Sequence, residues 1–358
     1  MHGGDIYGNR VDIDFSVNLN PYPRDGGTEE RIRRAMEEGT ANAVRYPDIL
    51  QRDVRKALAQ ANGLVPECVY AGNGASEIIK VITLMTAPKT ALLIEPCYSG
   101  YENALSTRGG CEIRRAFLSE EKGFGITDDL PDTITNDIDI LYIQDPVNPI
   151  GKSMDYELMY TILEKANRCY ITVLYDRSFY HLSDRSVDDP MPVMDILNRF
   201  DNVYIVSSYT KSFALPGIRM GYVMSTEHNI NRLIPYFPEW NLSSAATELI
   251  KACSDILENS DYLNRSVEYI RKERSFLIRE FSGLGFKVYE SDTVFILIKG
   301  LRGLYEMLLD KGILIRKCED FNGLDDGFYR IAVRCHEDNV RLIEAVRKVM
   351  DELRAYKT

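Results

Sequence analysis

The sequence predicts an α/β fold: a large domain with a mostly parallel sheet flanked by helices, followed by a smaller α+β domain. Short runs of apolar, β-branched residues recur between longer stretches with helical spacing. These runs are apolar on both faces, as in the buried strands of a parallel sheet. After about residue 245 the order of elements changes, which indicates the second domain.

Five strands are expected in the large domain. The stretch 155–168 between the second and third has apolar residues at positions 158, 159, 162, 163 and 166, which is helical spacing. Strands separated in this way are parallel and meet at their carboxyl ends, where α/β sheets bind ligands. The expected strands are 90–94, 139–144, 170–175, 203–207 and 220–224.

The smaller domain is expected to begin with a long helix over 246–281. Strands at 286–289 and 294–298, a helix at 304–310, strands at 313–316 and 329–333 and a helix at 337–353 follow. The first forty residues fit neither pattern, so we expect them to pack on the smaller domain. The predicted division is an arm over 1–40, a large domain over 41–245 and a small domain over 246–358.

The composition favours a folded protein that binds a small ligand. Apolar residues make up 45% and charged residues 27%, as in a globular protein with a full core. With 43 Lys and Arg against 54 Asp and Glu, the formal charge is −11. An acidic chain without a long basic run is a poor candidate for binding nucleic acid or an anionic membrane. Basic side chains gathered at one place would indicate a small anionic ligand.

Neither a metal site nor a secreted disulfide framework is expected. The seven cysteines include no C-x-x-C pair, and no Cys/His cluster has the spacing of a zinc site. The first residues, MHGGDIYGNR, lack the apolar segment of a signal peptide. No apolar run approaches the ~18 residues of a membrane helix. We therefore expect reduced thiols and a cytoplasmic protein.

The loop 72–77 (GNGASE) follows a short apolar stretch and opens a helix. Free N–H groups of Gly74, Ala75 and Ser76 could hold a phosphate there. A dinucleotide fingerprint would need a third glycine where Glu77 stands. The alternative is a plain turn.

The run 148–153 (NPIGKS) follows the second strand and resembles a P-loop only in part. Pro146 stands where that motif needs a glycine, and Pro149 removes an N–H group from the loop. Asn148 remains a polar side chain at the edge where the ligand is expected.

Two ionisable side chains follow the next strands. Asp176 ends the third strand, where a carboxylate could hold a cationic nitrogen of a ligand or could cap a helix. Lys211 follows the fourth strand, where burial would help it lose its proton and act as a nucleophile. Ser208 and Arg219 lie close to it in sequence and suit a phosphate. The alternative for Lys211 is a solvated surface lysine.

Two arginines stand in expected strands of the small domain. Arg316 and Arg330 suit carboxylates or phosphates, whose shape a guanidinium matches. The alternative is a pair of edge-strand residues facing water. His2, in His2-Gly3-Gly4, indicates little by itself.

The order of these residues, each weak alone, fits one cofactor, pyridoxal 5′-phosphate. Tyr98 would stack on its ring, and Asp176 would keep its pyridine nitrogen protonated. Lys211 would form the Schiff base. The phosphate would be held by Ser76, Ser208 and Arg219.

The sequence resembles the fold type I pyridoxal-phosphate enzymes of the aspartate aminotransferase superfamily over almost its whole length. More narrowly, it is similar to the group of histidinol-phosphate aminotransferases and threonine-phosphate decarboxylases. Residues 211–221 (KSFALPGIRMG) resemble the group's Schiff-base lysine motif with its phosphate arginine, and 148–151 stand where it has Asn-Pro-x-Gly. The segments 2–4, 14–21, 314–318 and 329–334 resemble the decarboxylase branch.

The resemblance implies further roles. Tyr46, in Tyr46-Pro47-Asp48, resembles a tyrosine that reaches the cofactor phosphate of a neighbouring subunit, which implies a homodimer with a shared active site. Asn148 would contact cofactor and substrate. Arg330 would hold the substrate carboxylate, and the substrate phosphate and nearby groups would be held by Arg316, His2 and Asn20.

Three positions depart from the group's pattern. Arg177 follows Asp176 where the group has Glu, and Phe179 stands where many aminotransferases have a tyrosine that bonds the cofactor's phenolic oxygen. Asp5 stands where the decarboxylase branch tends to have Asn.

The leading hypothesis is decarboxylation of an O-phosphorylated L-amino acid, O-phospho-L-threonine or O-phospho-L-serine. The first alternative is an aminotransferase of the histidinol-phosphate type. Which bond at the substrate's Cα stands perpendicular to the cofactor ring would decide between them. The sequence is also compatible with a non-catalytic protein of the same fold and with a nucleotide-binding protein.

Overall fold

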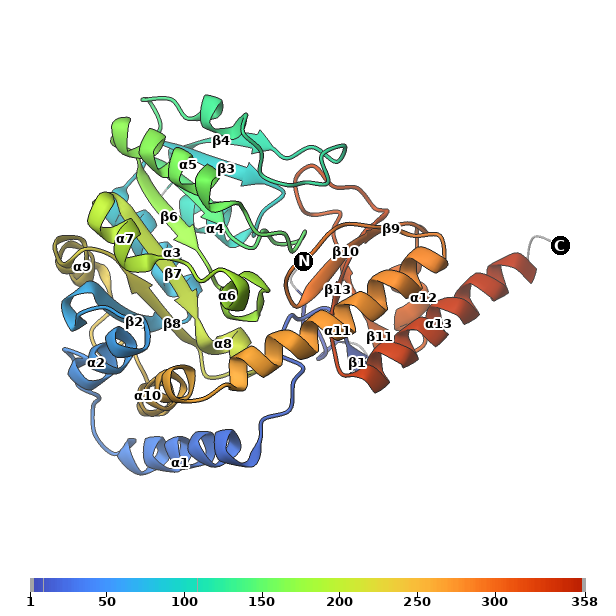
Figure 1. The fold of residues 1–358 in the computed structure, drawn as a ribbon, viewed down its shortest axis with the longest axis horizontal. Coiled ribbons are helices and arrows are strands. Elements are labelled where there is room, and N and C mark those ends of the chain that lie inside the picture. Colours follow the sequence, from blue (N-terminus) through green and yellow to red (C-terminus); the bar gives the residue numbers. More distant parts are fainter. Residues whose placement is uncertain (1–2, 9, 108, 356–358) are drawn as a thin grey trace.

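The large domain is a seven-stranded sheet between two layers of helices, as the sequence predicts. The computed structural model describes residues 3–8, 10–107 and 109–355 (Figure 1). The strands follow the order β2-β8-β7-β6-β5-β3-β4. β8 is antiparallel to both neighbours, and the other neighbouring pairs are parallel. These strands are β2 (Val69–Asn73), β3 (Thr90–Glu95), β4 (Glu112–Phe117), β5 (Ile140–Gln144), β6 (Thr172–Asp176), β7 (Val203–Ser208) and β8 (Met220–Met224).

Each face of this sheet has its own apolar core, because side chains of a strand alternate between faces. In β7, Val203 and Ile205 join one core and Tyr204 and Val206 the other. The first core is covered by α1 (Gly26–Asn42), α2 (Arg52–Ala61), α5 (Tyr156–Arg168), α7 (Val193–Arg199) and α10 (Ser244–Asn259). The second is covered by α3 (Ala75–Thr86), α4 (Gly100–Ser106) and α9 (Glu227–Leu233).

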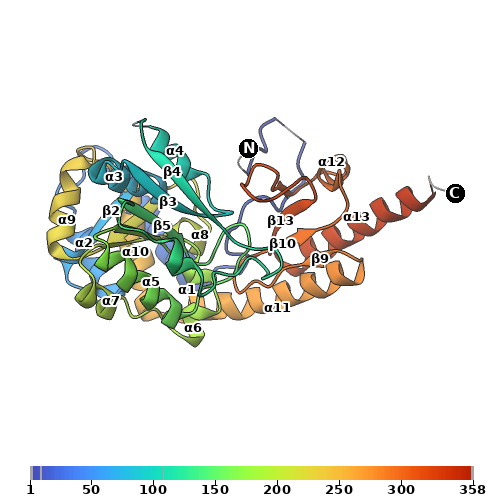
Figure 2. The same ribbon diagram turned by 90° about the horizontal axis from the view of Figure 1, so that it is seen from above.

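The small domain is a four-stranded antiparallel sheet packed against long helices. Figure 2 shows α11 (Tyr262–Gly283) running from beside the large sheet to the small one, with α13 (His336–Ala355) next to it. The strand order is β12 (Arg316–Lys317), β13 (Phe328–Ala332), β10 (Phe295–Lys299) and β9 (Lys287–Val288). A separate pair joins β1 (Ile13–Asp14) to β11 (Ile313–Leu314), and α12 (Leu304–Leu309) precedes β11. Shorter helices are α6 (Arg185–Asp188) and α8 (Tyr209–Ser212), and the 3₁₀ turns are Pro66–Cys68, Leu130–Thr133, Tyr180–Leu182 and Ile234–Tyr236.

Several elements differ from the sequence prediction. The helix expected over 246–281 is two helices, α10 and α11. The hydroxyl of Ser260 donates to the carbonyl of Ile256 (2.7 Å) and accepts from the N–H of Tyr262 (3.3 Å), so it replaces helical bonds at the break. The strand expected at 313–316 is divided between β11 and β12. Strands β1, β2 and β4 were not predicted; β4 is a half-exposed edge strand with charged residues and therefore has no apolar run.

The predicted domain boundaries at residues 40 and 245 stay predictions. The arm contacts both the small-domain core and a helix of the large domain. The arm's Phe15 accepts from the N–H of Ala332 (3.0 Å) and is buried in the small-domain core. Helix α1, however, packs on α10, whose buried Leu249 and Ile250 belong to the core of the large sheet.

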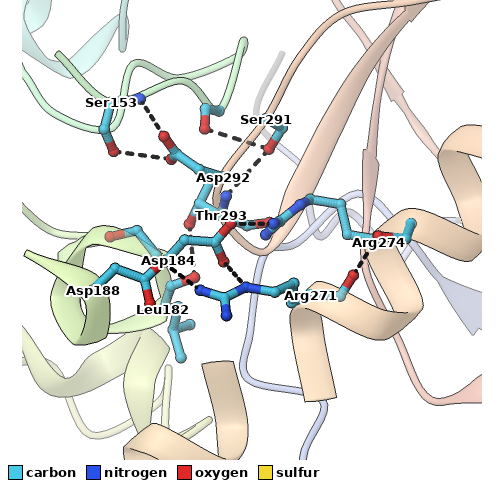
Figure 3. A network of polar contacts seen from close by, with 12 residues as sticks. Ser153, Leu182, Asp184, Asp188, Arg271, Arg274, Ser291, Asp292 and Thr293 are labelled. Atoms are coloured by element: carbon cyan, nitrogen blue, oxygen red, sulfur yellow. Dashed lines mark hydrogen bonds and ion pairs between the residues drawn. The ribbon is translucent and has the colours of Figure 1, made fainter. Parts of the chain in front are cut away.

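A polar junction fixes the small domain to the loops after β5 and β6 (Figure 3). The loop between β9 and β10 carries Asp292, whose carboxylate accepts from the N–H and the hydroxyl of Ser153, both at 2.9 Å. The N–H of Asp292 donates to the carbonyl of Gly151 (3.0 Å). The loop that contains Asn148 is therefore tied to the small domain.

The same junction includes ion pairs from α11. Arg274 pairs with Asp184, and its other terminal nitrogen donates to the carbonyl of Thr293 (3.1 Å). Arg271 bridges Asp184 (3.3 Å) and Asp188 (2.8 Å) (Figure 3). Because Arg274 and Thr293 are buried, the contacts of Arg274 with Asp184 and Thr293 are sheltered from water, and they join the small domain to the loop after β6.

No helix in the described part of the chain is both long enough and apolar enough to span a lipid bilayer.

Gly151 lies in this junction at a position where a side chain would not fit without a shift of its neighbours. Its φ is +94°, and an added Cβ would lie 2.4 Å from the hydroxyl of Ser291 and 3.0 Å from the carbonyl of Phe295. We expect Gly151→Ala to lower the free energy of unfolding by about 2–4 kcal/mol, from backbone strain and overpacking together. Urea unfolding would measure it.

The control is Gly283→Ala, at an exposed glycine where an added Cβ meets nothing within 4 Å. It should change the unfolding free energy by no more than about 1 kcal/mol. If both substitutions changed the unfolding free energy equally, the close approach of Gly151 to Ser291 and Phe295 would not matter for stability.

Candidate functional site

A cavity of about 280 Å³ lies at the carboxyl ends of β3, β5, β6 and β7 and is closed by the small domain and the arm. Most residues predicted for the site line it, although they come from six distant parts of the chain. The predicted residues that line it are Ala75, Ser76, Tyr98, Asn148, Asp176, Ser208, Lys211, Arg219, Arg316 and Arg330.

Lys211 lies in α8, immediately after β7. The hydroxyl of Ser208 caps this short helix by accepting from the N–H of Thr210 (3.1 Å) and donates to the carbonyl of Met220 (2.8 Å). Burial lowers the pKa of Lys211 to about 8, and the charges of Arg330 and Arg219 lower it in the same direction. A substantial fraction of the amine is therefore neutral near pH 8 and able to act as a nucleophile.

Asp176 ends β6 and is buried. It accepts hydrogen bonds from the N–H of Ser178 (2.9 Å), the hydroxyl of Ser178 (2.6 Å) and the hydroxyl of Tyr101 (2.8 Å). Burial raises its pKa, which these hydrogen bonds only partly offset. A cationic group of a ligand beside this carboxylate would favour its ionised form.

Residues at the N-terminus of α3 form an arrangement that suits a phosphate. Gly74 precedes the helix with φ +81°, and an added Cβ there would lie 2.6 Å from Nη2 of Arg219. Gly221 approaches the same loop, since its Cβ would lie 2.5 Å from the nitrogen of Ala75. The guanidinium thus lies against the start of α3, where Ala75 and Ser76 line the cavity. The first N–H groups of a helix and a guanidinium together suit an anion.

Tyr98 lines the cavity after β3, edge-on to Tyr101 with ring centroids 5.6 Å apart. Phe179 lines it after β6 and is perpendicular to Phe295, at 5.0 Å. The cavity is therefore lined by aromatic rings as well as polar groups, a combination that suits a planar ligand with polar substituents.

Arg330 is a buried cation held by two other parts of the chain. Its Nη1 donates to Oδ1 of Asn148 (2.6 Å), and its Nη2 donates to the carbonyl of Ser16 (2.6 Å). Burial lowers its pKa to about 10, so it remains charged at neutral pH. Its Nε has no partner in the described residues, which leaves a donor for a ligand.

Arg316 also lines the cavity, together with Arg219 and Arg330. Two further basic residues near the site do not line it. Arg334 pairs with Asp338 (2.8 Å), and Arg177 donates to Oδ1 of Asn62 (2.6 Å).

The structure does not bring Asn20 to the cavity. Its N–H donates to the carbonyl of Lys211 (3.0 Å), and its amide donates to the carbonyl of Ser212 (2.8 Å) and the hydroxyl of Ser266 (2.9 Å). It therefore contacts α8 and α11 in this structure, and its expected contact with substrate stays a prediction.

Tyr46 is also away from the cavity of its own chain. It is 78% exposed and lies against Trp240, with ring centroids 4.8 Å apart. Its expected contact with a neighbouring subunit stays a prediction. His2 lies outside the described residues.

The sequence analysis missed Asn18, which lines the cavity two residues before Asn20. It is 2% exposed, and neither its amide nitrogen nor its amide oxygen has a partner in the described residues. A buried amide without partners is costly, so its position indicates a ligand contact. No alternating pattern could have identified it, because residues 16 and 17 form a bend and Ser16, Val17 and Asn18 all line the cavity.

The missed partners of Asp176 are Tyr101 and Ser178. Their hydroxyls orient both oxygens of the carboxylate. Tyr101 carried no signal in the sequence, since it reaches Asp176 from α4 on a different part of the chain.

The residues around the cavity fit pyridoxal 5′-phosphate on their chemistry. A partly neutral amine at Lys211 suits its aldehyde, and a buried carboxylate at Asp176 suits its pyridine nitrogen. The start of α3 with Arg219 suits its phosphate. These groups share one cavity with two aromatic rings.

Comparison with known proteins supports the same cofactor. Residues 10–349 match the family model for class I and II aminotransferases. The chain is 32% identical, over 98% of its length and 94% of the relative's, to a protein of Caldanaerobacter subterraneus subsp. tengcongensis named provisionally as a threonine-phosphate decarboxylase. It is 28% identical to the threonine-phosphate decarboxylase of Salmonella typhimurium, over 94% of this chain and 91% of that one.

Solved structures give the same fold. The histidinol-phosphate aminotransferase of Clostridium acetobutylicum superposes with a TM-score of 0.85 at 27% identity, covering 95% of this chain and 99% of that one. The enzyme of that name from Sinorhizobium meliloti, solved with pyridoxal 5′-phosphate, superposes with a TM-score of 0.83 at 19% identity, covering 97% and 93%.

The burial of Lys211 has a measurable effect on stability without cofactor. Its folded pKa of about 8 lies below the ordinary 10.5. Below pH 8 the amine is charged in both states, and the folded state bears the desolvation cost. Lys211→Met should therefore stabilise cofactor-free protein at pH 7 by about 3 kcal/mol. The gain should disappear as pH rises from 8 to 10.5.

Urea unfolding of both proteins across this pH range checks the expectation. Lys272→Met, at an exposed lysine, is the control and should give a difference near zero. A gain at Lys211→Met that is equal at pH 7 and pH 10.5 would show that packing rather than charge causes it.

Proposed function

We propose that this chain, which belongs to the class I and II aminotransferase family and is a pyridoxal-phosphate-dependent enzyme, decarboxylates an O-phosphorylated L-amino acid. The observation that carries the substrate class is the presence of two buried arginines, Arg316 and Arg330, in the cavity of Lys211. Two fixed cations suit a substrate with two anionic groups. The choice of decarboxylation is supported by the two relatives with that name.

In the proposed mechanism the chain's residues orient the substrate. Arg330 holds the carboxylate, because Asn148 and the carbonyl of Ser16 fix its guanidinium. Arg316 stands directly opposite Arg330 on the neighbouring strand β12 and holds the phosphoryl group, to which Asn18 offers an amide. Holding both ends fixes the bond at Cα that breaks.

The cofactor, when bound, supplies an electron sink for the bond that breaks at Cα. Asp176 keeps a proton on the ring nitrogen, and Tyr101 and Ser178 keep the carboxylate in place. After CO2 leaves, a proton must reach Cα. Nζ of Lys211 can deliver it, because its pKa of about 8 lets it bind and release a proton near neutral pH.

The second candidate is an aminotransferase of the histidinol-phosphate type. The similarity to the Clostridium acetobutylicum enzyme, at 27% identity over 95% of the chain, favours it. The same residues serve either reaction: if Cα–H rather than the carboxylate were perpendicular to the ring, Nζ of Lys211 would remove that proton.

A homodimer with a shared site forms part of the proposal. Val44 and Tyr46 are 92% and 78% exposed, and Trp240 is 43% exposed. Large apolar side chains gathered on one surface favour an interface with another protein, here a second copy that would receive Tyr46.

The deciding experiment is a single-turnover assay of the holoenzyme with carboxyl-labelled O-phospho-L-threonine or O-phospho-L-serine, without a 2-oxo acid. We expect CO2 release with the starting cofactor spectrum restored. Conversion to the pyridoxamine form without CO2 would instead establish the aminotransferase.

Lys211→Ala should lower the single-turnover rate by about 10⁴-fold or more, since it removes both the nucleophile and the proton donor. The rate of CO2 release after mixing measures this loss. Lys272→Ala, at an exposed position, should retain the full rate. Undiminished turnover in Lys211→Ala would refute the assigned role.

Asn18→Ala should affect substrate binding without lowering the stability of the fold. Because its amide has no partner in the described residues, removal should leave the free energy of unfolding unchanged or raise it by about 1 kcal/mol. The KM for the phosphorylated substrate should rise about tenfold with a smaller change in kcat, if the amide bonds the substrate. Loss of stability with an unchanged KM would make Asn18 a structural residue.

A further inference from the structure

Gln144 lines the cavity but has no part in the function proposed above. It is the last residue of β5, it is only 6% exposed, and it stands in register with Asp176 at the end of β6. Two residues earlier, Tyr142 and Leu174 pair in the same way and belong to one apolar core. Because side chains alternate along a strand, Gln144 and Asp176 project to that same face of the sheet.

The amide of Gln144 has an unused donor group. Its Oε1 accepts from the N–H of Asn148 in a long hydrogen bond (3.4 Å), which distinguishes the oxygen end of the amide from the nitrogen end. No hydrogen bond joins its Nε2 to another residue in the part of the chain that the structure describes. A ligand that fills the cavity takes water from this NH2 group, so the group then needs an acceptor on the ligand.

The order of the strands determines which part of the cofactor meets Gln144. Along the sheet the order is β2, β8, β7, β6 and β5. The proposed phosphate site lies where β2 leads into α3 and where Arg219 precedes β8. Lys211 follows β7, Asp176 ends β6, and Gln144 ends β5. The proposed anchors of the cofactor therefore occur in order across the cavity, with Gln144 on the side away from the phosphate.

The cofactor carries its phosphate arm and its phenolic oxygen on the two ring carbons beside the one that bears the aldehyde. Its ring nitrogen lies opposite the aldehyde. If the nitrogen is at Asp176, the aldehyde at Lys211 and the phosphate arm toward Arg219, the phenolic oxygen is turned to the other side, toward β5. This oxygen is negatively charged when the cofactor is bound, so it is a strong acceptor for an N–H donor.

Phe179 cannot serve this oxygen, although it lines the cavity after β6, because its ring carries no hydroxyl. The amide of Asn148 is already partly engaged, since its Oδ1 accepts from Nη1 of Arg330 (2.6 Å). Gln144 thus supplies a neutral N–H donor beside Asn148, in a cavity where position 179 offers none.

We propose that Gln144 is a cofactor-binding residue whose Nε2 donates to the phenolic oxygen of pyridoxal 5′-phosphate. The inference rests on the roles proposed above for Lys211, Asp176 and Arg219, and it holds for decarboxylation and transamination alike. A donor on this oxygen stabilises its negative charge and weakens its attraction for the proton on the neighbouring Schiff-base nitrogen. Gln144 therefore lowers the pKa of that nitrogen.

Gln144→Leu removes the donor and keeps an apolar side chain of similar size. The holoenzyme is titrated with acid and base in the absence of substrate, and the cofactor's visible absorbance is followed. We expect the midpoint of this titration to rise by about one pH unit, the order expected for one hydrogen bond to a charged group. Gln60→Leu is the matched control: it makes the same substitution at an exposed glutamine of α2, which bonds Glu258, and should leave the midpoint unchanged. Gln144→Met serves as a second variant if urea unfolding shows that Gln144→Leu is unstable.

A cofactor analogue without the phenolic oxygen tests the contact directly. Cofactor-free wild-type protein and Gln144→Leu are each titrated with pyridoxal 5′-phosphate and with 3-deoxypyridoxal 5′-phosphate. The preference for the natural cofactor should fall about tenfold in Gln144→Leu, because only the natural cofactor can use the donor. Gln60→Leu should keep the wild-type preference.

The outcomes separate this inference from the proposed function. A higher midpoint together with a reduced preference for the natural cofactor supports the contact. An unchanged midpoint overturns the inference, and so does an unchanged preference, which would make Gln144 only a part of the cavity wall. A rise in the KM for substrate alongside both changes would show that Gln144 acts by moving Asn148, which fixes Arg330, and would overturn it as well. In each of these cases CO2 release by the wild-type enzyme leaves the proposed function standing, while wild-type protein that binds neither cofactor overturns both.

Discussion

The buried guanidinium of Arg330 is the contact on which the geometry of the site depends. Its two terminal nitrogens bond Asn148 of the large domain and the carbonyl of Ser16 in the arm, while its own strand belongs to the small domain. A buried cation needs such partners, because desolvation without them is costly. Three segments more than a hundred residues apart are thereby held around one cavity, and the junction of Asp292 with Ser153 supports the same loop from the other side.

The same burial gives the site its chemical character. It shifts the pKa of Lys211 downward and that of Asp176 upward, so both groups are drawn toward their neutral forms. Lys211 gains nucleophilicity in this way, and a cationic partner beside Asp176 would restore its ionised form. Arg219 at the start of α3 stays available for an anion. One low-dielectric cavity thus supplies the contrasting properties that a zwitterionic aromatic cofactor needs.

An element of the fold was predictable where the spacing of its apolar residues matches the side chains that the structure buries. The five apolar strands of the large domain and the helices after residue 245 follow directly from periodicity, because buried strands and amphipathic helices have different spacings. Strand β4 was missed because its charged side chains lie at a half-exposed sheet edge. The break between α10 and α11 was missed because apolar spacing continues through it, and only the hydrogen bonds of Ser260 end the helix.

By itself, the sequence determined the α/β class, the cofactor and the positions of Asp176 and Lys211, since each stands at the carboxyl end of an apolar strand whose direction the fold class fixes. Only the tertiary structure decided which arm residue faces the cavity. Asn18 and Asn20 lie on the same segment two positions apart, but contacts with Ser212 and Ser266 draw Asn20 to α8 and α11, while Asn18 is left without a partner in the described residues. Only the structure, likewise, placed Asp320 on Arg316, because charge pairing depends on the turn of the chain after β12, which local pattern does not encode.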